Sequence, residues 1–228
     1  MSPAIRSILG IVVSYAFVFG FIGLATLLLK RGRLGPTATR KVIHIGVSHW
    51  WLIAMALISD PWVASIGPAT FIVINAIALR KHMLPAMDEG ADSRNAGTVY
   101  FPISLLVLVN LCWRGLLPLW VGGAAVLVLG WGDGLAALVG ERFRNPGFSF
   151  WGRRKSLAGT SVMFAASFIV VLGFTLLFDT VRPGLVPALG TAAAVAGVAT
   201  IVEAVTPLGI DNLTVPLAVV ALYAGVFR

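Results

Sequence analysis

The chain has 228 residues, of which 58% are hydrophobic and only 11% are charged, and its mean hydropathy is +0.95. A soluble domain of this size cannot bury so much apolar surface, so the composition excludes an ordinary soluble protein and predicts a polytopic helical membrane protein. The single cysteine, Cys112, excludes a disulfide framework. The net charge of +8 argues against nucleic acid as a partner, because the basic residues are spread between apolar runs rather than gathered in a patch.

Apolar segments recur along the whole chain. A helix of about 20 residues crosses roughly 30 Å of hydrocarbon. Eight segments meet or approach this length: 5–29, 42–59, 62–79, 99–113, 116–140, 157–178, 185–205 and 213–227. The first is longer than the core of a cleaved secretory signal and lacks a small-residue cleavage site, so we expect it to be retained. The sequence therefore predicts an all-α fold of about eight transmembrane helices, forming one domain over residues 1–228.

The basic residues are distributed unequally between the loops. Alternating assignment of the loops puts thirteen on one side of the membrane: Lys30, Arg31, Arg33, Arg40, Lys41, Arg80, Lys81, Arg94, Arg142, Arg144, Arg153, Arg154 and Lys155. Four remain on the other side: Arg6, Arg114, Arg182 and Arg228. By the positive-inside rule the first side is cytoplasmic, which places both termini on the non-cytoplasmic side. We therefore expect an active site that faces the cytoplasm, in the inner membrane of a prokaryote.

An ionised carboxylate within a membrane span is costly unless it has a partner or a function. Asp133 lies in the sequence Gly-Trp-Gly-Asp-Gly at 130–134, roughly 13 Å inside the cytoplasmic end of its span if the helix is regular. The flanking glycines allow another backbone, an ion or a phosphate to approach closely. Pairing with an arginine for packing alone is the alternative interpretation.

Glu203 and Asp211 lie on either side of a helix break. Pro207 and Gly209 interrupt the chain between them, and non-helical backbone at this depth is tolerated only where it is buried or lines a cavity. Asp133, Glu203 and Asp211 can then converge. Carboxylates, with water and phosphate oxygens, are the usual ligands of Mg²⁺ in proteins. We interpret the three residues as a magnesium site, with ordinary interfacial residues as the alternative for the last two.

The segment 153–160 combines positive charge with a helix start, where backbone N–H groups and cations together favour a polyphosphate. The candidate nucleotide-binding residues here are Arg153, Arg154, Lys155, Ser156, Gly159 and Thr160. Charges that only set the topology are the alternative. Neither a P-loop nor a Rossmann glycine pattern occurs, so a nucleotide must be bound by some other arrangement.

Two further groups lie at the same predicted face of the membrane. Arg40 and Lys41 precede His44 by four and three residues, so each can neighbour this ring on a helix. A basic topology signal beside a packed histidine is the alternative. Tyr100, in the sequence Gly-Thr-Val-Tyr at 97–100, begins the fourth span and is either an interfacial anchor or a substrate contact.

Several short motifs occur in a fixed order between residues 40 and 217. Three of them resemble the signature of CTP-dependent polyprenol kinases, a group that includes phytol, farnesol, geranylgeraniol and dolichol kinases. They are, in chain order, Gly-Asp-Gly-Leu-Ala at 132–136, Gly-Glu-Arg-Phe at 140–143 and Lys-Ser-Leu-Ala-Gly-Thr at 155–160. Three further segments are similar to the phytol kinase branch in particular: 203–217, Arg40-Lys41-x-x-His44 and 97–100. The first two motifs are also similar to those of phosphatidate cytidylyltransferases. Arg144 departs from the pattern, because a glycine commonly follows the phenylalanine of the second motif.

The resemblance implies transfer of the γ-phosphoryl group of CTP to the hydroxyl of a membrane isoprenoid alcohol of the phytol or geranylgeraniol type, with release of CDP. The partners are then CTP, the alcohol and the lipid bilayer, and Mg²⁺ is the cofactor. Asp133, Glu203 and Asp211 are then expected to bind the metal, and Asp133, Asp211 or His44 to accept the proton. The candidate residues of 153–160, with Asn212 and Lys41, are expected to bind the nucleotide, and Tyr100 to contact the alcohol. Two alternatives stay open, which are nucleotidyl transfer from CTP to a lipid phosphate and membrane transport, because transporters also bury carboxylates among broken helices.

Overall fold

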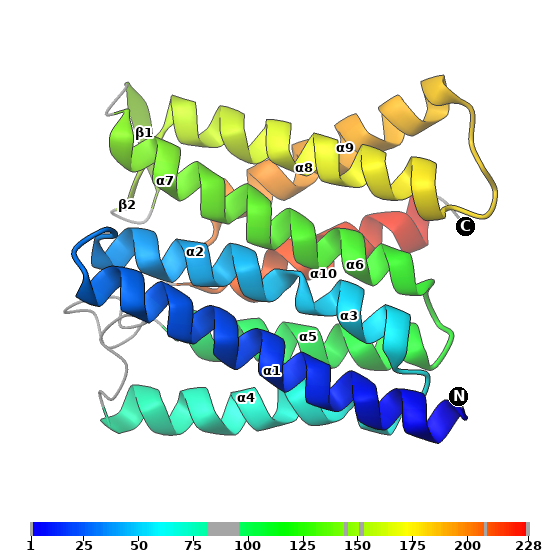
Figure 1. Ribbon diagram of the computed structural model, residues 1–228. Helices are drawn as coiled ribbons and strands as arrows, with labels where there is room; N and C mark the ends of the chain where they lie inside the picture. Colours follow the sequence, from blue (N-terminus) through cyan, green and yellow to red (C-terminus); the bar gives the residue numbers. More distant parts are fainter. Residues whose placement is uncertain (1, 82–95, 144–145, 151–152, 208, 227–228) are drawn as a thin grey trace. The chain divides into compact units, whose positions relative to one another are not determined.

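The computed structural model describes residues 2–81, 96–143, 146–150, 153–207 and 209–226. Within these ranges the backbone is almost entirely helical, and the chain divides into two compact units, Met1–Leu119 and Trp120–Arg228. In each unit the successive long helices run in opposite directions (Figure 1).

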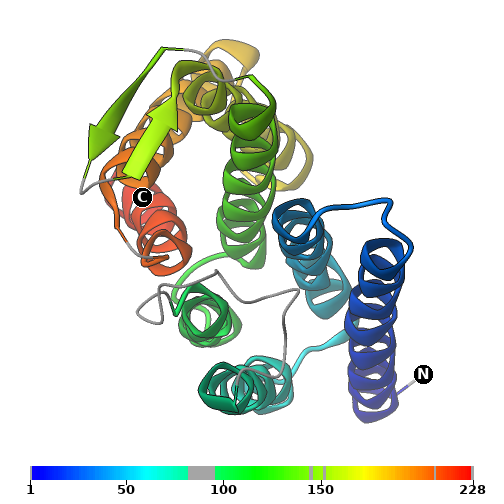
Figure 2. The same ribbon diagram turned by 90° about the vertical axis from the view of Figure 1, so that its left-hand side faces the viewer.

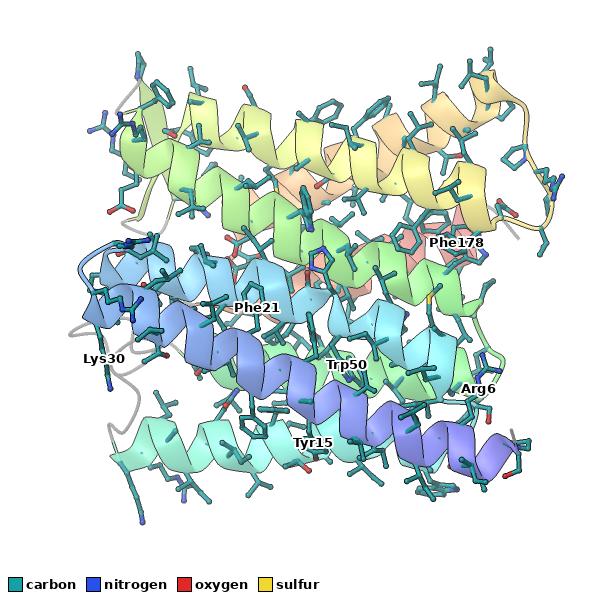
Figure 3. The ribbon with its side chains drawn as sticks, in the orientation of Figure 1. Arg6, Tyr15, Phe21, Lys30, Trp50 and Phe178 are labelled. Atoms are coloured by element: carbon teal, nitrogen blue, oxygen red, sulfur yellow. The ribbon has the colours of Figure 1, made fainter. Side chains whose placement is uncertain are left out.

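The first unit contains α1 (Pro3–Lys30), α2 (Pro36–Ser48), α3 (Trp50–Leu57), α4 (Pro61–Lys81) and α5 (Gly97–Trp113). Helix α1 packs against α2, α3 and α4, and α4 packs against α5. Gly46 permits the close contact of α2 with α1, because a Cβ atom at this position would lie 2.0 Å from Cε1 of Phe21, which is labelled in Figure 3. From α1, the Tyr15 hydroxyl donates a 2.8 Å hydrogen bond to Thr70 Oγ1 on α4 (Figure 3).

Tryptophans hold α3 in place within the first unit. The Trp51 side chain is fully buried, its indole N–H donates to the Leu119 carbonyl at 2.9 Å, and its ring lies 5.1 Å from that of Trp113. Helices α2 and α3 are separated only at His49, whose Nδ1 lies 2.9 Å from the Ile45 carbonyl. The segment expected as one span over 42–59 is therefore a helix with a break near its middle.

Prolines and a capping carboxylate define several helix starts. Pro3, Pro36 and Pro61 begin α1, α2 and α4, where a fixed φ suits the helix and no backbone N–H is needed. Asp60 Oδ1 accepts two N–H groups from the first turn of α4, at 2.8 and 2.9 Å. These residues satisfy the backbone at positions where the helix itself provides no partner.

The second unit continues from α6 (Leu119–Leu127) through the π-helical segment η1 (Val128–Asp133), α7 (Gly134–Arg142), β1 (Gly147–Phe150), β2 (Arg153–Ser156), α8 (Leu157–Phe178), α9 (Leu185–Val205) and α10 (Asp211–Val226). Helix α8 packs against η1, α7 and α9, and α10 packs against η1 and α9. The Tyr223 hydroxyl of α10 lies 3.2 Å from Thr175 Oγ1 on α8, and its ring lies 5.4 Å from that of Trp120.

Strands β1 and β2 form an antiparallel hairpin in the segment that the sequence predicts only as a loop, which adds a two-stranded sheet to the predicted all-α fold. Gly147 is required there, because a Cβ atom would lie 2.0 Å from the Lys155 carbonyl oxygen across the ladder. The hairpin lies at the end of the second unit where α7 ends and α8 begins, and this end faces the viewer in Figure 2.

Among the described residues, five helical stretches are long and apolar enough to cross a membrane: α1, α4, residues 119–142, α8 and α9. Helices α5 and α10 are apolar but shorter. Exposed apolar side chains on these helices, such as Ile169 and Leu177 on α8, are 69% and 78% accessible and suit contact with lipid. The chain is a membrane protein, whereas its eight spans and the orientation of its termini stay predictions.

Candidate functional site

The three predicted carboxylates lie together in the second unit. Asp133 ends η1, Glu203 lies in the last turn of α9, and Asp211 begins α10. One carboxylate oxygen from each lies within 4.8 Å of the others, and the residues are only 5%, 4% and 8% exposed. Because ionised carboxylates repel one another and lose hydration when buried, such a cluster requires a compensating positive charge.

The local sequence explains how Asp133 reaches this position. The segment 128–133 is π-helical, a geometry that accommodates one more residue per turn than an α-helix and occurs frequently at functional sites. Gly132 faces α8, where a Cβ atom would lie 2.5 Å from Met163 Sδ and 3.0 Å from Ser167 Oγ. The glycine therefore allows η1 to pack closely on α8 beside the carboxylate.

The turn between α9 and α10 brings Asp211 back toward Glu203. Gly209 adopts a φ of +75°, a left-handed conformation that glycine adopts without steric cost. The Thr206 and Thr214 hydroxyl oxygens lie 3.1 Å apart across the turn. The Asn212 side-chain amide donates to the Gly209 carbonyl at 3.0 Å and to Asp211 Oδ1 at 3.2 Å. The predicted helix break is thus a turn with several internal hydrogen bonds.

Lys155 provides positive charge to the cluster. Its Nζ forms an ion pair with Glu203 Oε1, although the two residues are 48 positions apart in the sequence. Lys155 belongs to β2, so the hairpin carries its ammonium group to the end of α9. The three carboxylates and Lys155 together have a formal charge of −2 when all are ionised, which a divalent cation would balance. An all-oxygen set of donors fits Mg²⁺ rather than a softer metal.

The start of α8 lies against α7. Ser156 caps α8 by accepting the Gly159 N–H at 3.0 Å. Gly140 and Gly159 bring the two backbones into contact, since a Cβ atom at 159 would lie 2.8 Å from the Ala136 carbonyl oxygen and 3.5 Å from Gly140 Cα. The Thr160 hydroxyl is buried and makes no hydrogen bond to any of the described residues. A hydroxyl in this setting at a helix start is suited to an anionic oxygen.

The structure brings several of the predicted residues together within the second unit. Asp133, Glu203, Asp211 and Asn212 share one site with Lys155, whereas Arg154 is exposed on the hairpin and the Arg153 side chain lies outside the described atoms. Lys41, His44 and Tyr100 are half-buried residues of the first unit. The His44 ring packs 4.8 Å from that of Phe101 on α5. Arg144, the departure from the family motif, lies outside the described residues.

Sequence reasoning missed the pairing of Lys155 with Glu203 and the hairpin that makes it possible. A weak signal was present, because Phe148 and Phe150 alternate with smaller residues before a basic run, as in a strand with two different faces. Asn75 has a structural role: its side-chain amide donates to the Thr98 carbonyl at 2.8 Å and thereby ties α4 to the start of α5.

Comparison with known proteins identifies relatives along most of the chain. It is 37% identical over 206 residues to the phytol kinase of Synechocystis sp., covering 89% of this chain and 85% of the relative. It is 30% identical to the probable chloroplastic phytol kinase 2 of Glycine max, covering 84% of this chain and 66% of that protein. A probable chloroplastic phytol kinase of Triticum aestivum is 28% identical, with coverages of 84% and 68%. No family model matches the chain, and no solved structure matches it.

Proposed function

The chain belongs to the phytol kinase family and is therefore an enzyme, and we propose that it transfers the γ-phosphoryl group of CTP to the hydroxyl of phytol or a related isoprenoid alcohol. The alcohol oxygen forms a bond to the γ-phosphorus while the bond between that phosphorus and the β,γ-bridging oxygen breaks. The hydroxyl proton passes to a base on the protein. The products are a prenyl monophosphate and CDP.

One observation supports this proposal above the others: the buried cluster of Asp133, Glu203 and Asp211 lies beside Lys155 of β2, two residues before α8 begins. Phosphoryl transfer depends on in-line positioning and neutralisation of charge more than on covalent chemistry by the protein. Acidic residues that bind a divalent cation, and a cation and helix start that bind phosphate oxygens, are the groups that such a reaction requires.

We assign the residues of this site as follows. Asp133, Glu203 and Asp211 would hold Mg²⁺, which supplies positive charge to the triphosphate when bound. Lys155, Ser156 and Thr160, with the N–H groups at the start of α8, would bind phosphate oxygens, and the exposed Arg154 would attract the nucleotide from solution. Asp133, Asp211 and His44 are the candidate proton acceptors.

The membrane setting suits the two substrates. Phytol and related alcohols partition into the bilayer with the hydroxyl near the interface, whereas CTP stays in water. Glu203 and Asp211 lie at the end of α9 and the beginning of α10, whereas Asp133 lies within the helical stretch 119–142, where η1 passes into α7. We propose that this end of the second unit faces the cytoplasm, because Lys155, Arg154 and Arg142 are among the residues that the positive-inside rule assigns to that side.

The test is an assay of purified protein in detergent or liposomes with Mg²⁺, γ-labelled CTP and a panel of phytol, geranylgeraniol, farnesol and diacylglycerol, with phosphatidate in parallel. We expect label in a phytyl or geranylgeranyl monophosphate and formation of CDP. Label released as pyrophosphate, with cytidine retained on the lipid, would instead identify a cytidylyltransferase. Absence of any nucleotide-dependent product would refute the proposal and direct attention to transport.

Asp133→Asn tests the site within this assay. The variant keeps nearly the same shape but removes one negative charge, so we expect turnover to fall by at least a hundredfold while the protein stays folded. Asp179→Asn is the matched control, because Asp179 lies at the opposite end of α8, where its carboxylate accepts the Val181 N–H at 2.9 Å. Near-normal turnover of Asp133→Asn would remove this residue from the site.

A further inference from the structure

The two phenylalanines of β1 lie on the same face of the hairpin as Lys155. The ladder pairs Phe148 directly with Lys155, and residues directly opposite each other in an antiparallel pair project to the same face. Phe150 lies two positions along the strand and therefore shares that face. Lys155 reaches Glu203 from it, so the face that carries both rings is the one that carries the ammonium group to the carboxylate cluster.

The hairpin cannot lie in the hydrocarbon of the membrane. A two-stranded sheet has two open edges with unpaired N–H and C=O groups, and lipid offers these groups no hydrogen bonds. The described part of the hairpin is a sheet of two strands only. It must therefore lie in water or at the headgroups, where the second unit meets nucleotide rather than the isoprenoid chain.

Aromatic surface is nevertheless exposed there. Phe150 is 46% accessible, and its ring lies 5.7 Å from that of Phe148 at an interplanar angle of 73°. The exposed Phe150 and the half-buried Phe148, beside charged residues outside the membrane, offer a stacking surface. The planar base of a nucleotide is the water-soluble partner that such a surface suits.

We infer that the base of the nucleotide stacks on Phe150 of the hairpin, with the Phe148 ring against its edge, while its phosphates bind at Lys155 and the start of α8. This inference rests on the proposed function. It names the hairpin as the part of the site that binds the nucleoside. Phe148 lies opposite Lys155 and Phe150 lies two residues, about 7 Å, further along the strand, so the aromatic surface extends away from Lys155 as the base of a nucleoside triphosphate extends away from its phosphates.

The experiment measures binding without turnover, in detergent-purified full-length protein and without an alcohol acceptor. The probes are CTP and inorganic tripolyphosphate, which has the phosphates but no base. We expect Phe150→Ala to raise the Kd for CTP roughly 5- to 150-fold, the range typical for loss of one base–aromatic stack, and to leave the Kd for tripolyphosphate unchanged. Phe148→Ala should act in the same direction.

Conservative variants separate stacking from packing. Phe150→Trp should retain CTP binding, whereas Phe150→Leu, which keeps the apolar volume but has no ring, should weaken it nearly as much as alanine does. Phe178→Leu is the control, because this ring is also exposed, at 40%, but lies at the opposite end of α8 (Figure 3). It should change neither Kd.

Four results would overturn the inference. Equal weakening of CTP and tripolyphosphate would mean that the substitutions disturb the hairpin itself. Unchanged CTP binding together with a raised KM for phytol would assign the rings to the alcohol. Unchanged CTP binding with normal kinase activity would leave the proposed function intact and refute only the stacking role. A wild-type protein that neither binds CTP nor uses it would refute both.

Discussion

Gly159→Ala tests the contact that joins α7 to α8 beneath the proposed site. The added Cβ atom would lie 2.8 Å from the Ala136 carbonyl oxygen, and Gly140 Cα is 3.5 Å away. Carbon and carbonyl oxygen rarely approach closer than about 3.3 Å, so the two helices must separate by roughly 0.5 Å. Ser156 Oγ, 3.1 Å away, can rotate, but the closest atom is the Ala136 backbone oxygen, so no side-chain rotation relieves that clash.

The magnitude follows from two opposing terms. Overpacking of a tight contact costs about 1–3 kcal/mol, whereas replacing glycine by alanine inside a helix stabilises the folded state by about 0.5–1 kcal/mol. The midpoints of the two ranges give a net destabilisation of about 1.3 kcal/mol, within limits of about 0 and 2.5 kcal/mol. For a chain of this size, each kcal/mol shifts the melting temperature by about 2–4 °C, so the Tm should fall by about 3–5 °C.

Gly173→Ala is the matched control, because Gly173 lies on the same helix and an added Cβ atom would meet nothing within 4 Å. It should raise the Tm by about 1–4 °C, so the two alanine variants are expected to shift it in opposite directions. The assay is thermal unfolding in detergent without nucleotide, followed by kcat measurement. An unchanged or higher Tm for Gly159→Ala, with normal kcat, would refute the account of the α7–α8 contact.

Three other predictions concern the carboxylate cluster and its turn. Lys155→Met should lower the free energy of unfolding by about 1–3 kcal/mol, because it leaves the buried Glu203 carboxylate without this ammonium partner. In chemical denaturation, the double variant Lys155→Met/Glu203→Gln should recover most of this loss, and no recovery would contradict the pairing. Gly209→Ala should lower the free energy of unfolding by about 1–2 kcal/mol, because alanine is strained at a φ of +75°, and should reduce turnover by displacing Asp211. A variant as stable and as active as wild type would show that the turn does not require glycine. Chelation of divalent cations should abolish phytol phosphorylation, and added Mg²⁺ should restore it in wild type but not in Asp133→Asn. Activity that survives chelation would exclude the metal site.

The long apolar helices were predictable because their composition leaves no alternative. The segments 157–178 and 185–205 coincide with α8 and α9 at both ends, since each lies between polar or helix-breaking residues. The convergence of Glu203 with Asp211 also followed from the sequence, because Pro207 and Gly209 require a break that returns the chain to the same level.

Other features carry no comparable signal. The pairing of Lys155 with Glu203 joins residues on separate elements, and a single sequence does not reveal which cation meets which carboxylate. The break at His49 lies within a continuous apolar pattern, so periodicity alone gave one span. The π-helical segment differs from an α-helix by the hydrogen bonds of a single turn, which composition does not encode.

The π-helical segment also gives this stretch a tolerance to changes in length that a regular helix lacks. A π-helical turn holds about one residue more than an α-helical turn, so deleting one residue between 128 and 133 would convert it to an α-helical turn and leave α7 in register with α6. Gly140, seven positions beyond Asp133, would then still face Gly159, whereas Asp133 itself would lose the wide turn that positions it. The same deletion within α8 would rotate every later residue of that helix by about 100°.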